Sequence, residues 1–237
     1  MKISQSNLRI DKYFIWRGQD ISRLEAFSDA VFAFAITLLV VSLEVPSSYA
    51  ELIETMRGFV SFAISFAMLV FLWFYHFLFF RRYGLQTNYI LILNSILLFV
   101  ILFYIYPLKF LFNFLVNIFW GTSSVAVSMF NNEFESANLM VIYSTGLFII
   151  FFVYMLMYMN AFRHRKHLKL NALEILFTKS VYEAHIIYAS VCLISVLIAL
   201  FTDQVALSGF IYALFGPVRA VHGFFISKRF KEISVNI

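Results

Sequence analysis

The stretch RLEAFSDAVFAFAITLLVV, residues 23–41, begins with charged side chains and then becomes almost wholly apolar. Its entrance holds Arg23, Glu25 and Asp29, and Thr37 carries the one hydroxyl of its central part. Because successive helical residues turn by about 100°, Glu25 and Asp29 share a face, where two like charges slightly destabilise a helix. Asp29 is therefore expected to find its partner on another helix or on a neighbouring subunit.

The composition of the whole chain indicates a membrane protein. Of its 237 residues, 62% are hydrophobic and 13% are charged, whereas a soluble domain has about 45–50% apolar and about 25% charged residues. A soluble core could not bury 31 phenylalanines without a far larger polar shell. The single cysteine, Cys192, excludes an intrachain disulfide and a cysteine-based metal site, and the common nucleotide- and metal-binding motifs do not occur. We therefore expect no cofactor and no bound metal.

Six apolar stretches are long enough to cross a bilayer, whose core of about 30 Å needs roughly 20 helical residues. They are expected at residues 26–45, 59–80, 88–106, 139–162, 182–202 and 205–225. The sequence therefore predicts an all-α membrane protein with six transmembrane helices in each subunit.

The charges between these stretches predict the orientation in the membrane. One set of loops is basic and carries Arg81, Arg82, Arg163, Arg165, Lys166, Lys169 and Lys179. The opposite loops are mostly acidic and carry Glu44, Glu51, Glu54, Glu133, Glu135 and Asp203. Because positive charge resists translocation, the basic side and both termini are expected in the cytoplasm. This divides the chain into a cytoplasmic arm (1–20), a six-helix transmembrane domain (21–227) and a cytoplasmic tail (228–237).

Two connecting segments are harder to interpret. Residues 107–130 are aromatic but interrupted by Gly121, so they either extend the third helix past the bilayer or lie at the outer interface. Residues 164–180 place leucines between charges, which predicts a short amphipathic helix on the inner surface. The basic loops at this surface could also contact anionic lipid headgroups. Arg81 and Arg82, at the same depth as Asp29, are its candidate partners, as is Arg23 of a neighbouring subunit.

Within the membrane, one stripe of the first stretch contains Ala30, Phe34, Thr37, Val41 and Glu44, and Leu38 borders it. Three interpretations compete: a packed seam between helices, the wall of a substrate cavity, and a pore wall made of one helix per subunit. A cavity would need several polar groups, which this helix lacks. A pore wall needs a hydrophobic constriction, a hydroxyl or two and an acidic mouth, which Glu44 would supply. Spacing alone favours the packed seam.

Residues 23–40 nevertheless resemble the signature first helix of the transmembrane protein 175 family, the lysosomal-type potassium channels and their bacterial relatives. Their R-x-x-x-F-S-D element is specific in this membrane context. The resemblance extends to LWFYHFLF at residues 72–79, to LNSIL at residues 93–97 and to Pro107. A single copy of the motif is similar to the bacterial form, which implies a homotetramer in the bacterial inner (plasma) membrane.

The resemblance also implies a function. It implies passive, potassium-preferring conduction without a TVGYG filter, through a central pore lined by the first helix. The family's hydrophobic bottleneck, usually Ile or Leu, falls on Phe34 in this sequence. Thr37 falls on a hydroxyl layer implicated in selectivity, and Leu38 and Val41 fall on further wall positions. Glu44 would stand at the pore mouth.

The same resemblance implies a bracing network at the inner ends of the first three helices. Its expected members are Arg23, Phe27, Ser28, Asp29, Trp73, His76 and Asn94. Ordinary physical chemistry supports such a network, because Trp73 and His76 share a helix face and each would be costly in hydrocarbon without a hydrogen-bond partner. An interhelical bond to Asn94 is an ordinary structural role.

Two other functions are weighed against the channel. A proton-coupled secondary transporter could use Asp29 and His76 as relay groups, because intramembrane ionisable residues often mark such relays. The sequence lacks the inverted repeats and broken helices that are typical of transporters. A membrane enzyme would need clustered acid, base or metal groups, and no nucleophile accompanies Asp29 and His76. The chain is therefore not expected to be an enzyme.

Overall fold

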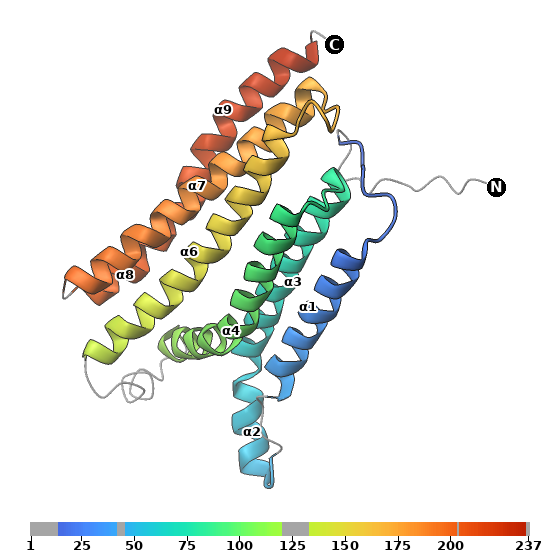
Figure 1. Cartoon of the computed structure of the whole chain (residues 1–237). Helices are drawn as coiled ribbons and strands as arrows, with labels where there is room; N and C mark the ends of the chain where they lie inside the picture. Colours follow the sequence, from blue (N-terminus) through green and yellow to red (C-terminus); the bar gives the residue numbers. More distant parts are fainter. Residues whose placement is uncertain (1–13, 42–45, 120–132, 203, 236–237) are drawn as a thin grey trace.

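The computed structural model describes residues 14–41, 46–119, 133–202 and 204–235, so the predicted mouth residue Glu44 lies outside the described residues. The helices in these ranges are α1 (Arg23–Val41), α2 (Tyr49–Arg57), α3 (Phe59–Tyr83), α4 (Asn88–Phe119), α6 (Glu133–Arg163), α7 (Ala172–Phe201), α8 (Val205–Phe210), the 3₁₀ turn η2 (Ile211–Leu214) and α9 (Phe215–Val235). Figure 1 shows that they form an elongated bundle of nearly parallel and antiparallel helices.

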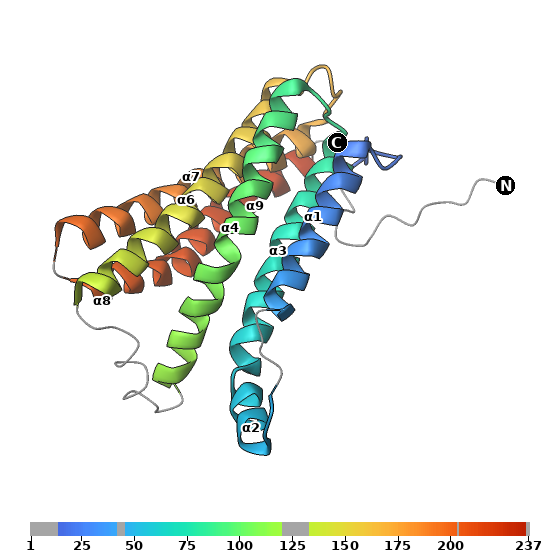
Figure 2. The same ribbon diagram turned by 60° about the horizontal axis from the view of Figure 1, so that its bottom comes forward.

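The bundle consists of two groups of helices. Helices α1, α3 and α4 pack on one another, and α6, α7 and α9 form the second group, in which α7 contacts both neighbours. Contacts between α4 and α6 join the two groups, while α2 extends away from them (Figure 1; Figure 2). The first group contains every side chain of the predicted inner network.

Six helical segments are long and apolar enough to cross a membrane within the part of the chain that is described. They are Arg23–Val41, Phe59–Tyr83, Asn88–Ile118, Glu135–Arg163, Ala172–Phe201 and Val205–Phe230. The number and the order of these segments confirm the six predicted spans. Several are longer than predicted, because polar residues at the ends of an apolar stretch continue the helix into the interface.

The first helix begins where the sequence places a capping signal. The Ser22 hydroxyl accepts a hydrogen bond from the Glu25 backbone N–H at 3.1 Å, and the Glu25 carboxylate accepts one from the Ser22 N–H at 2.9 Å. This reciprocal pair is a capping box, which satisfies two backbone donors that a helix start leaves unpaired. The cap sets the start of α1 next to the arm that precedes it.

Helix α4 shows that residues 107–119 extend the third predicted helix, which was one of the two alternatives for this segment. It continues through Pro107 to Phe119, so the third predicted helix extends past the expected end at residue 106. Proline lacks the N–H that would bond to the preceding turn, and it commonly bends a helix without ending it. The ribbon changes direction along α4 in both views (Figure 1; Figure 2). Residues 120–130 lie outside the described part of the chain.

The prediction of a separate amphipathic helix at residues 164–180 is wrong. A turn follows α6, with Lys169 in the left-handed region at φ 48°, and α7 then begins at residue 172. The Asn171 side chain caps the Glu174 N–H, and the Glu174 carboxylate in turn accepts from the Asn171 N–H, each at 2.9 Å. This capping box starts α7 ten residues before the predicted span, and residues 172–180 are its first turns.

The last predicted span consists of α8, the 3₁₀ turn η2 and α9 in succession. Helix α9 runs without a break to Val235, so residues 228–235 of the predicted tail are helical. Where the described part of the chain begins, Phe14 is 5% exposed and packs into the hydrophobic core. The end of α9 and the turn between α6 and α7 lie at the same end of the bundle (Figure 1).

Candidate pore face and inner polar network

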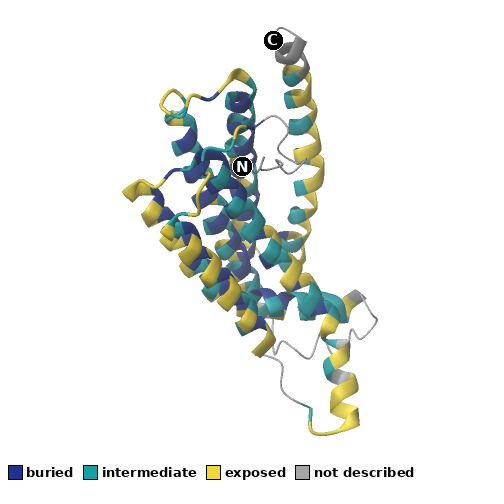
Figure 3. Cartoon of the chain, turned by 90° about the vertical axis from the view of Figure 1, so that its right-hand side faces the viewer, coloured by how far each residue is buried: buried dark blue, intermediate teal, exposed yellow. Residues whose placement is uncertain are grey.

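Helix α1 has two different faces. Its buried residues follow the helical period and pack toward α3 and α4, and they are Glu25, Ser28, Phe32, Ala35 and Leu39. The opposite face is uncovered by the described helices and includes Ala30, Ala33, Phe34, Thr37 and Val41. Figure 3 shows exposed residues along one side of α1 and along most of α9. The part of the predicted stripe that lies in α1, from Ala30 to Val41, is therefore the face that the described residues leave open.

The open face of α1 is chemically unlike the open face of α9. Asp29 and Thr37 are exposed on α1, whereas α9 exposes the large hydrophobic side chains Val221, Phe224 and Phe225 together with the basic side chains Arg219, Lys228 and Arg229. An ionisable group inside a membrane protein normally faces a protein partner or a water-filled cavity. Among the side chains that the structure describes, the open face of α1 therefore differs from that of α9 in exposing an acidic group.

Phe34 and Thr37 project from this open face. Phe34 is 55% exposed, which leaves its ring free of the packed core. The Thr37 hydroxyl donates a hydrogen bond to the Ala33 carbonyl at 2.9 Å. Because its hydrogen is used within the helix, the lone pairs of the hydroxyl oxygen are the part available to an outside group. These lone pairs could coordinate a cation.

The remaining predicted wall residues differ in position. Val41 is 71% exposed at the end of α1. Leu38 is half-buried and packs against the hydrophobic core, so it lies at the border of the open face. Among the four predicted wall residues, the core contact therefore distinguishes Leu38 from Phe34, Thr37 and Val41.

A buried chain of hydrogen bonds joins α1, α3 and α4. The Asn94 side-chain amide donates to the Ser28 hydroxyl at 2.9 Å, and His76 Nε2 donates to the Asn94 oxygen at 2.7 Å. All three side chains are buried. A buried polar group without a partner costs about 1–3 kcal/mol, so this chain fixes how the three helices face one another.

Asp29 is held by a tryptophan rather than by an arginine. The Trp73 indole Nε1 donates to the Asp29 carboxylate at 2.8 Å. The expectation that Arg81 pairs with Asp29 is wrong, because Arg81 instead lies 3.8 Å from the Glu25 carboxylate. Arg82 is buried and lies over the Phe177 ring at 4.6 Å. The last turn of α3 therefore directs its two arginines to different neighbours.

Two members of the predicted network are not brought together with the others. Phe27 is 60% exposed. Arg23 is also exposed and makes no hydrogen bond or ion pair with another described residue of this chain. Both lie on the side of α1 that faces away from α3 and α4. The structure thus gathers Ser28, His76 and Asn94 in one group and Asp29 with Trp73 in another.

The main polar contact of the arm was not expected from the sequence. Arg17 forms an ion pair with Glu174 at 2.7 Å, although the two residues are far apart in the chain. The pattern of asparagine at residue 171 and glutamate three residues later is a capping signal that could have drawn attention to Glu174. No local pattern could have identified Arg17 as its partner.

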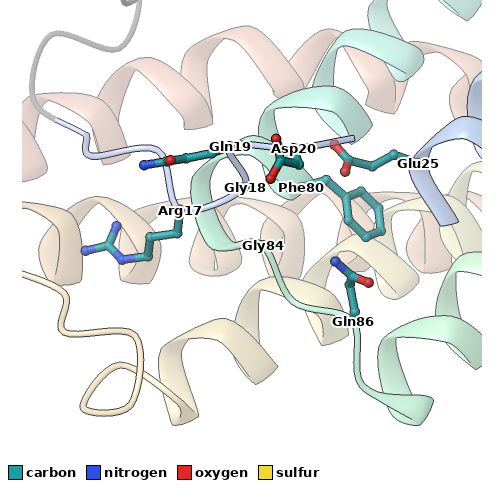
Figure 4. Close-up of a pocket in the computed structure, with 8 residues that line it drawn as sticks. All are labelled: Arg17, Gly18, Gln19, Asp20, Glu25, Phe80, Gly84 and Gln86. Atoms are coloured by element: carbon teal, nitrogen blue, oxygen red, sulfur yellow. The ribbon is translucent and has the colours of Figure 1, made fainter. Parts of the chain in front are cut away.

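A polar cavity of about 340 Å³ lies between this arm and the last turn of α3. Figure 4 shows Gln19, Asp20 and Glu25 around it, while the Arg17 side chain points away from Glu25. Glu25 is part of the cap of α1, so the cavity adjoins the start of that helix. Within the described ranges, no group of three His, Cys, Asp or Glu side chains is arranged to hold a metal ion.

Ionisable groups also occur at two other places. At the start of α2, hydrogen bonds from the Ser47 hydroxyl and backbone N–H, each 2.7 Å long, keep the pKa of Glu51 below its ordinary value. Between α7 and α9, His222 bonds to Arg219 at 3.0 Å and to Glu183 at 3.3 Å. Neither group touches the open face of α1.

The fold and these contacts define an all-α, multi-pass membrane protein. Residues 23–104 match the family described as "Endosomal/lysosomal potassium channel TMEM175". A protein of Marivirga tractuosa described as "Potassium channel" is 40% identical over 98% of both chains. A potassium channel of Chamaesiphon minutus is 30% identical over 41% of this chain and 52% of its own length.

Solved structures agree with this relationship. A variant of the potassium channel MtTMEM175, crystallised with a nanobody–MBP fusion protein, is 41% identical, with a TM-score of 0.82 over 92% of this chain and 98% of its own. A TMEM175 homologue from Chamaesiphon minutus, described as a lysosomal potassium-selective channel, shares the fold at 20% identity, with a TM-score of 0.56 over 88% and 96% of the two chains. The chain belongs to the TMEM175 family of potassium channels. It is therefore an ion channel and not an enzyme.

Proposed function

We propose that four copies of this chain form a potassium-preferring channel, with the open faces of four α1 helices around one central pore. The observation that carries the proposal is the uncovered stripe of α1, which combines Phe34, Thr37 and Val41 on the side opposite the packed core. A homotetramer would cover this stripe and give its polar groups an aqueous surface. Relatives described as potassium channels support conduction of K⁺.

In this proposal Phe34 supplies the hydrophobic gate. A ring of four phenyl groups would narrow the pore and expel water, and an ion cannot cross a dry apolar constriction without losing its hydration. Rotation of the rings away from the axis would let water and ions through. Conduction is passive, because it needs only this opening and a gradient.

Thr37 supplies the selectivity layer in the same proposal. It lies one helical turn from Phe34, and its hydroxyl hydrogen is already bonded to Ala33. Four such hydroxyl groups would present oxygen lone pairs toward the axis, and these can replace part of the water shell of a cation. Leu38 and Val41 complete the wall, and Glu44 would attract cations to the outer mouth.

The proposed orientation puts both termini in the cytoplasm of a bacterial cell, with the channel in the plasma membrane. The supporting observation is that the last turns of α3 and α6 and the turn after α6 are basic, with Arg81, Arg82, Arg163, Arg165 and Lys166, which favours the cytoplasmic side. We also propose contacts between these basic turns and anionic lipid headgroups. Residues 21–227 would form the channel domain, residues 1–20 the arm and residues 228–237 the tail.

The hydrogen bonds of Asp29 and His76 argue against a proton relay between them. Asp29 bonds to the indole N–H of Trp73, which can only donate and cannot pass a proton onward. His76 bonds to Asn94, which has no titratable proton. The two residues are therefore held in separate groups, each of which serves to pack helices.

Thiol labelling tests the pore assignment directly. A positively charged methanethiosulfonate reagent should block potassium flux through the Phe34→Cys variant in reconstituted liposomes. Phe224→Cys is the matched control, because Phe224 is 71% exposed on α9, away from the proposed pore. The native Cys192 is buried and leaves the wild type as an unlabelled reference. Equal sensitivity of the two cysteine variants would refute a pore along α1.

A further inference from the structure

We propose that residues 14–22, the described part of the arm together with its link to α1, are a brace that positions the inner end of α1 and thereby controls how readily the channel opens. Arg17, Arg81 and Glu174 are its positioning residues. The inference rests on the proposed function, because it matters for conduction only if α1 lines the pore. It concerns contacts at the inner end of the bundle, outside the α1 stripe.

One end of the brace is anchored at Arg17. Its guanidinium makes five hydrogen bonds, which equals its number of N–H donors. Nε donates to the Leu168 carbonyl at 2.6 Å. Nη1 donates to the Ile15 carbonyl and to Glu174, at 2.8 and 3.0 Å. Nη2 donates to the Lys169 carbonyl and to Glu174, at 3.1 and 2.7 Å. A lysine has only three donors on one nitrogen and cannot reproduce this fork.

Glu174 accepts two of the five Arg17 bonds while it also caps α7. Its carboxylate accepts from the Ile15 N–H at 2.8 Å, from Arg17 and from the Asn171 N–H at 2.9 Å. In this ion pair the Glu174 side chain is fully buried, and the Arg17 side chain is 17% exposed. Charge-assisted, two-pronged bonds of this kind are shorter and more directional than neutral ones. The arm is therefore fixed to the first turn of α7.

The arm then crosses the end of α3 at very short range. The backbone N–H groups of Arg17 and Gly18 both donate to the Arg81 carbonyl at 3.1 Å. A Cβ atom on Gly18 would lie 2.5 Å from the Phe80 carbonyl oxygen, which is closer than a side chain can approach. Gly84 has φ +59°, and a Cβ atom added there would lie 3.2 Å from the Arg17 carbonyl group. These two glycines allow the arm and α3 to run in direct backbone contact.

Arg81 transmits the position of the arm to α1. Its Nη1 donates to the carbonyl oxygens of Gly18 and Gln19, at 3.0 and 3.2 Å. Its Nε lies 3.8 Å from the Glu25 carboxylate, and Glu25 caps the first turn of α1 through Ser22. Arg81 therefore contacts both the arm and the first turn of α1. The polar cavity in Figure 4 lies beside this junction, and both Gly18 of the arm and Glu25 of α1 line it.

A second anchor involves Arg82 and two aromatic rings. The Arg82 guanidinium lies 5.5 Å from the Phe14 ring centre and 4.6 Å from that of Phe177 on α7. The Phe14 ring in turn contacts the rings of Tyr83 and Phe177. The arm is thus held between α3 and α7 by apolar contacts as well as by the Arg17 bonds. The two arginines at the end of α3 therefore contact different parts of the arm: Arg81 contacts Gly18 and Gln19, and Arg82 contacts Phe14.

A small movement of the α1 start is amplified at the proposed gate. Phe34 lies eleven residues after Arg23, which is about 16 Å along a helix that rises 1.5 Å per residue. A tilt of about 5° at the start of α1 would shift Phe34 by about 1.4 Å. A shift of this size around a symmetry axis changes the width of a constriction appreciably. The brace would therefore act on opening through the angle of α1.

Single-channel recording of reconstituted tetramers tests the brace. Glu174→Gln removes the charge but keeps a residue that supports a capping box. Arg17→Lys keeps the charge but loses the fork. We expect each variant to change the open probability several-fold while the tetramer mass stays unchanged. Lys228→Ala, which removes an exposed charge from α9 at the same end of the bundle, should leave the open probability unaltered.

A labelling experiment distinguishes the brace from the pore assignment. The rate at which a methanethiosulfonate reagent modifies Phe34→Cys should change several-fold when Glu174→Gln is added, because the rate reports the position of α1. If Phe34→Cys is not blocked at all, the proposed function fails. If Phe34→Cys is blocked, but Glu174→Gln and Arg17→Lys alter neither its labelling rate nor the open probability, the brace fails alone.

Loss of assembly is also a decisive outcome. If both variants no longer form the wild-type oligomer, the arm is a folding element and the positioning role is overturned. If only Glu174→Gln fails to assemble, the result with Arg17→Lys decides. The double variant should change the open probability no more than the larger single effect, because both substitutions disrupt the same contact.

Discussion

The indole nitrogen of Trp73 donates a 2.8 Å hydrogen bond to the carboxylate of Asp29, and this bond ties α1 to α3. It satisfies the polar edge of a tryptophan that otherwise packs against the apolar core. It also gives the one carboxylate on the uncovered side of α1 a fixed direction. A bond between a neutral donor and a charged acceptor is stronger than one between neutral groups.

Removing this hydrogen bond should destabilise the channel even when an aromatic ring is kept at position 73. Trp73→Phe keeps an aromatic ring and loses the N–H, so we expect a loss of about 1.5–3 kcal/mol per subunit, the range for bonds to charged groups. Thermal unfolding of the purified channel, followed by circular dichroism, measures the effect. Tyr106→Phe, which removes an exposed hydroxyl from α4, is the control. A Trp73→Phe melting curve that overlays the wild type would show that the bond contributes nothing.

The buried bonds of Asn94 give a second prediction. Asn94→Ala leaves the buried His76 N–H without its acceptor and removes the donor to the Ser28 hydroxyl, which keeps its own bond to the Leu24 carbonyl. An unsatisfied buried group such as the His76 N–H costs about 1–3 kcal/mol, so the variant should unfold at a clearly lower temperature or fail to assemble. Ser95→Ala is the matched control, because Ser95 is exposed and bonds only within its own helix. Comparable stability of Asn94→Ala and Ser95→Ala would contradict the prediction.

A close contact between α4 and α6 predicts that Gly146 tolerates no larger side chain. A Cβ atom at this position would lie 2.3 Å from the Tyr104 ring, and Tyr104 is buried and bonded to the Tyr143 carbonyl at 2.9 Å. Overpacking of a filled core costs about 1–3 kcal/mol, so Gly146→Ala should lower the melting temperature.

The control for this substitution should change stability in the opposite direction or leave it unchanged. Gly223 lies in α9, and a Cβ atom added there would meet no other atom within 4 Å. Alanine is favoured over glycine within a helix by about 1 kcal/mol, so Gly223→Ala should leave stability unchanged or raise it. The two glycines therefore separate a packing effect from helix propensity. Similar melting temperatures for both variants would disprove the close contact at Gly146.

Truncation of the proposed gate should increase conduction. Phe34→Ala removes a ring that is 55% exposed on the open face of α1, so it should widen the constriction and let water remain in it. We expect a several-fold larger single-channel conductance or open probability in reconstituted bilayers. Phe224→Ala, on the exposed face of α9, is the control. Unchanged currents in Phe34→Ala would count strongly against the gate.

Loss of the Thr37 hydroxyl should affect selectivity more than conductance. Thr37→Val keeps the shape of the side chain and removes the oxygen lone pairs, whereas Thr37→Ser keeps a hydroxyl that can bond to Ala33 in the same way. We expect a shifted reversal potential under potassium–sodium gradients in Thr37→Val, with less preference for K⁺, and little change in Thr37→Ser. Identical reversal potentials in both variants would remove Thr37 from the selectivity layer.

The amino-acid sequence by itself determined the class of protein and much of its architecture. Long apolar stretches required six helices, because backbone groups in a bilayer must be bonded within a helix. The period of 3.6 residues predicted that Ala30, Phe34, Thr37 and Val41 share one face of α1, and the structure leaves that face uncovered. Capping boxes begin at Ser22 and Asn171 and mark the starts of α1 and α7, but neither was used to predict where these helices start.

Only the tertiary structure decided which side chains meet. Asn94 bonds to Ser28, which is 66 residues away, and Arg17 bonds to Glu174, which is 157 residues away. Periodicity gives the face on which a residue lies, but the rotation and depth of each helix against its neighbours depend on how all the side chains pack together. For that reason the resemblance placed Asp29 and Trp73 in one network, while their direct bond and the pairing of Arg81 with Glu25 were seen only in the packed bundle.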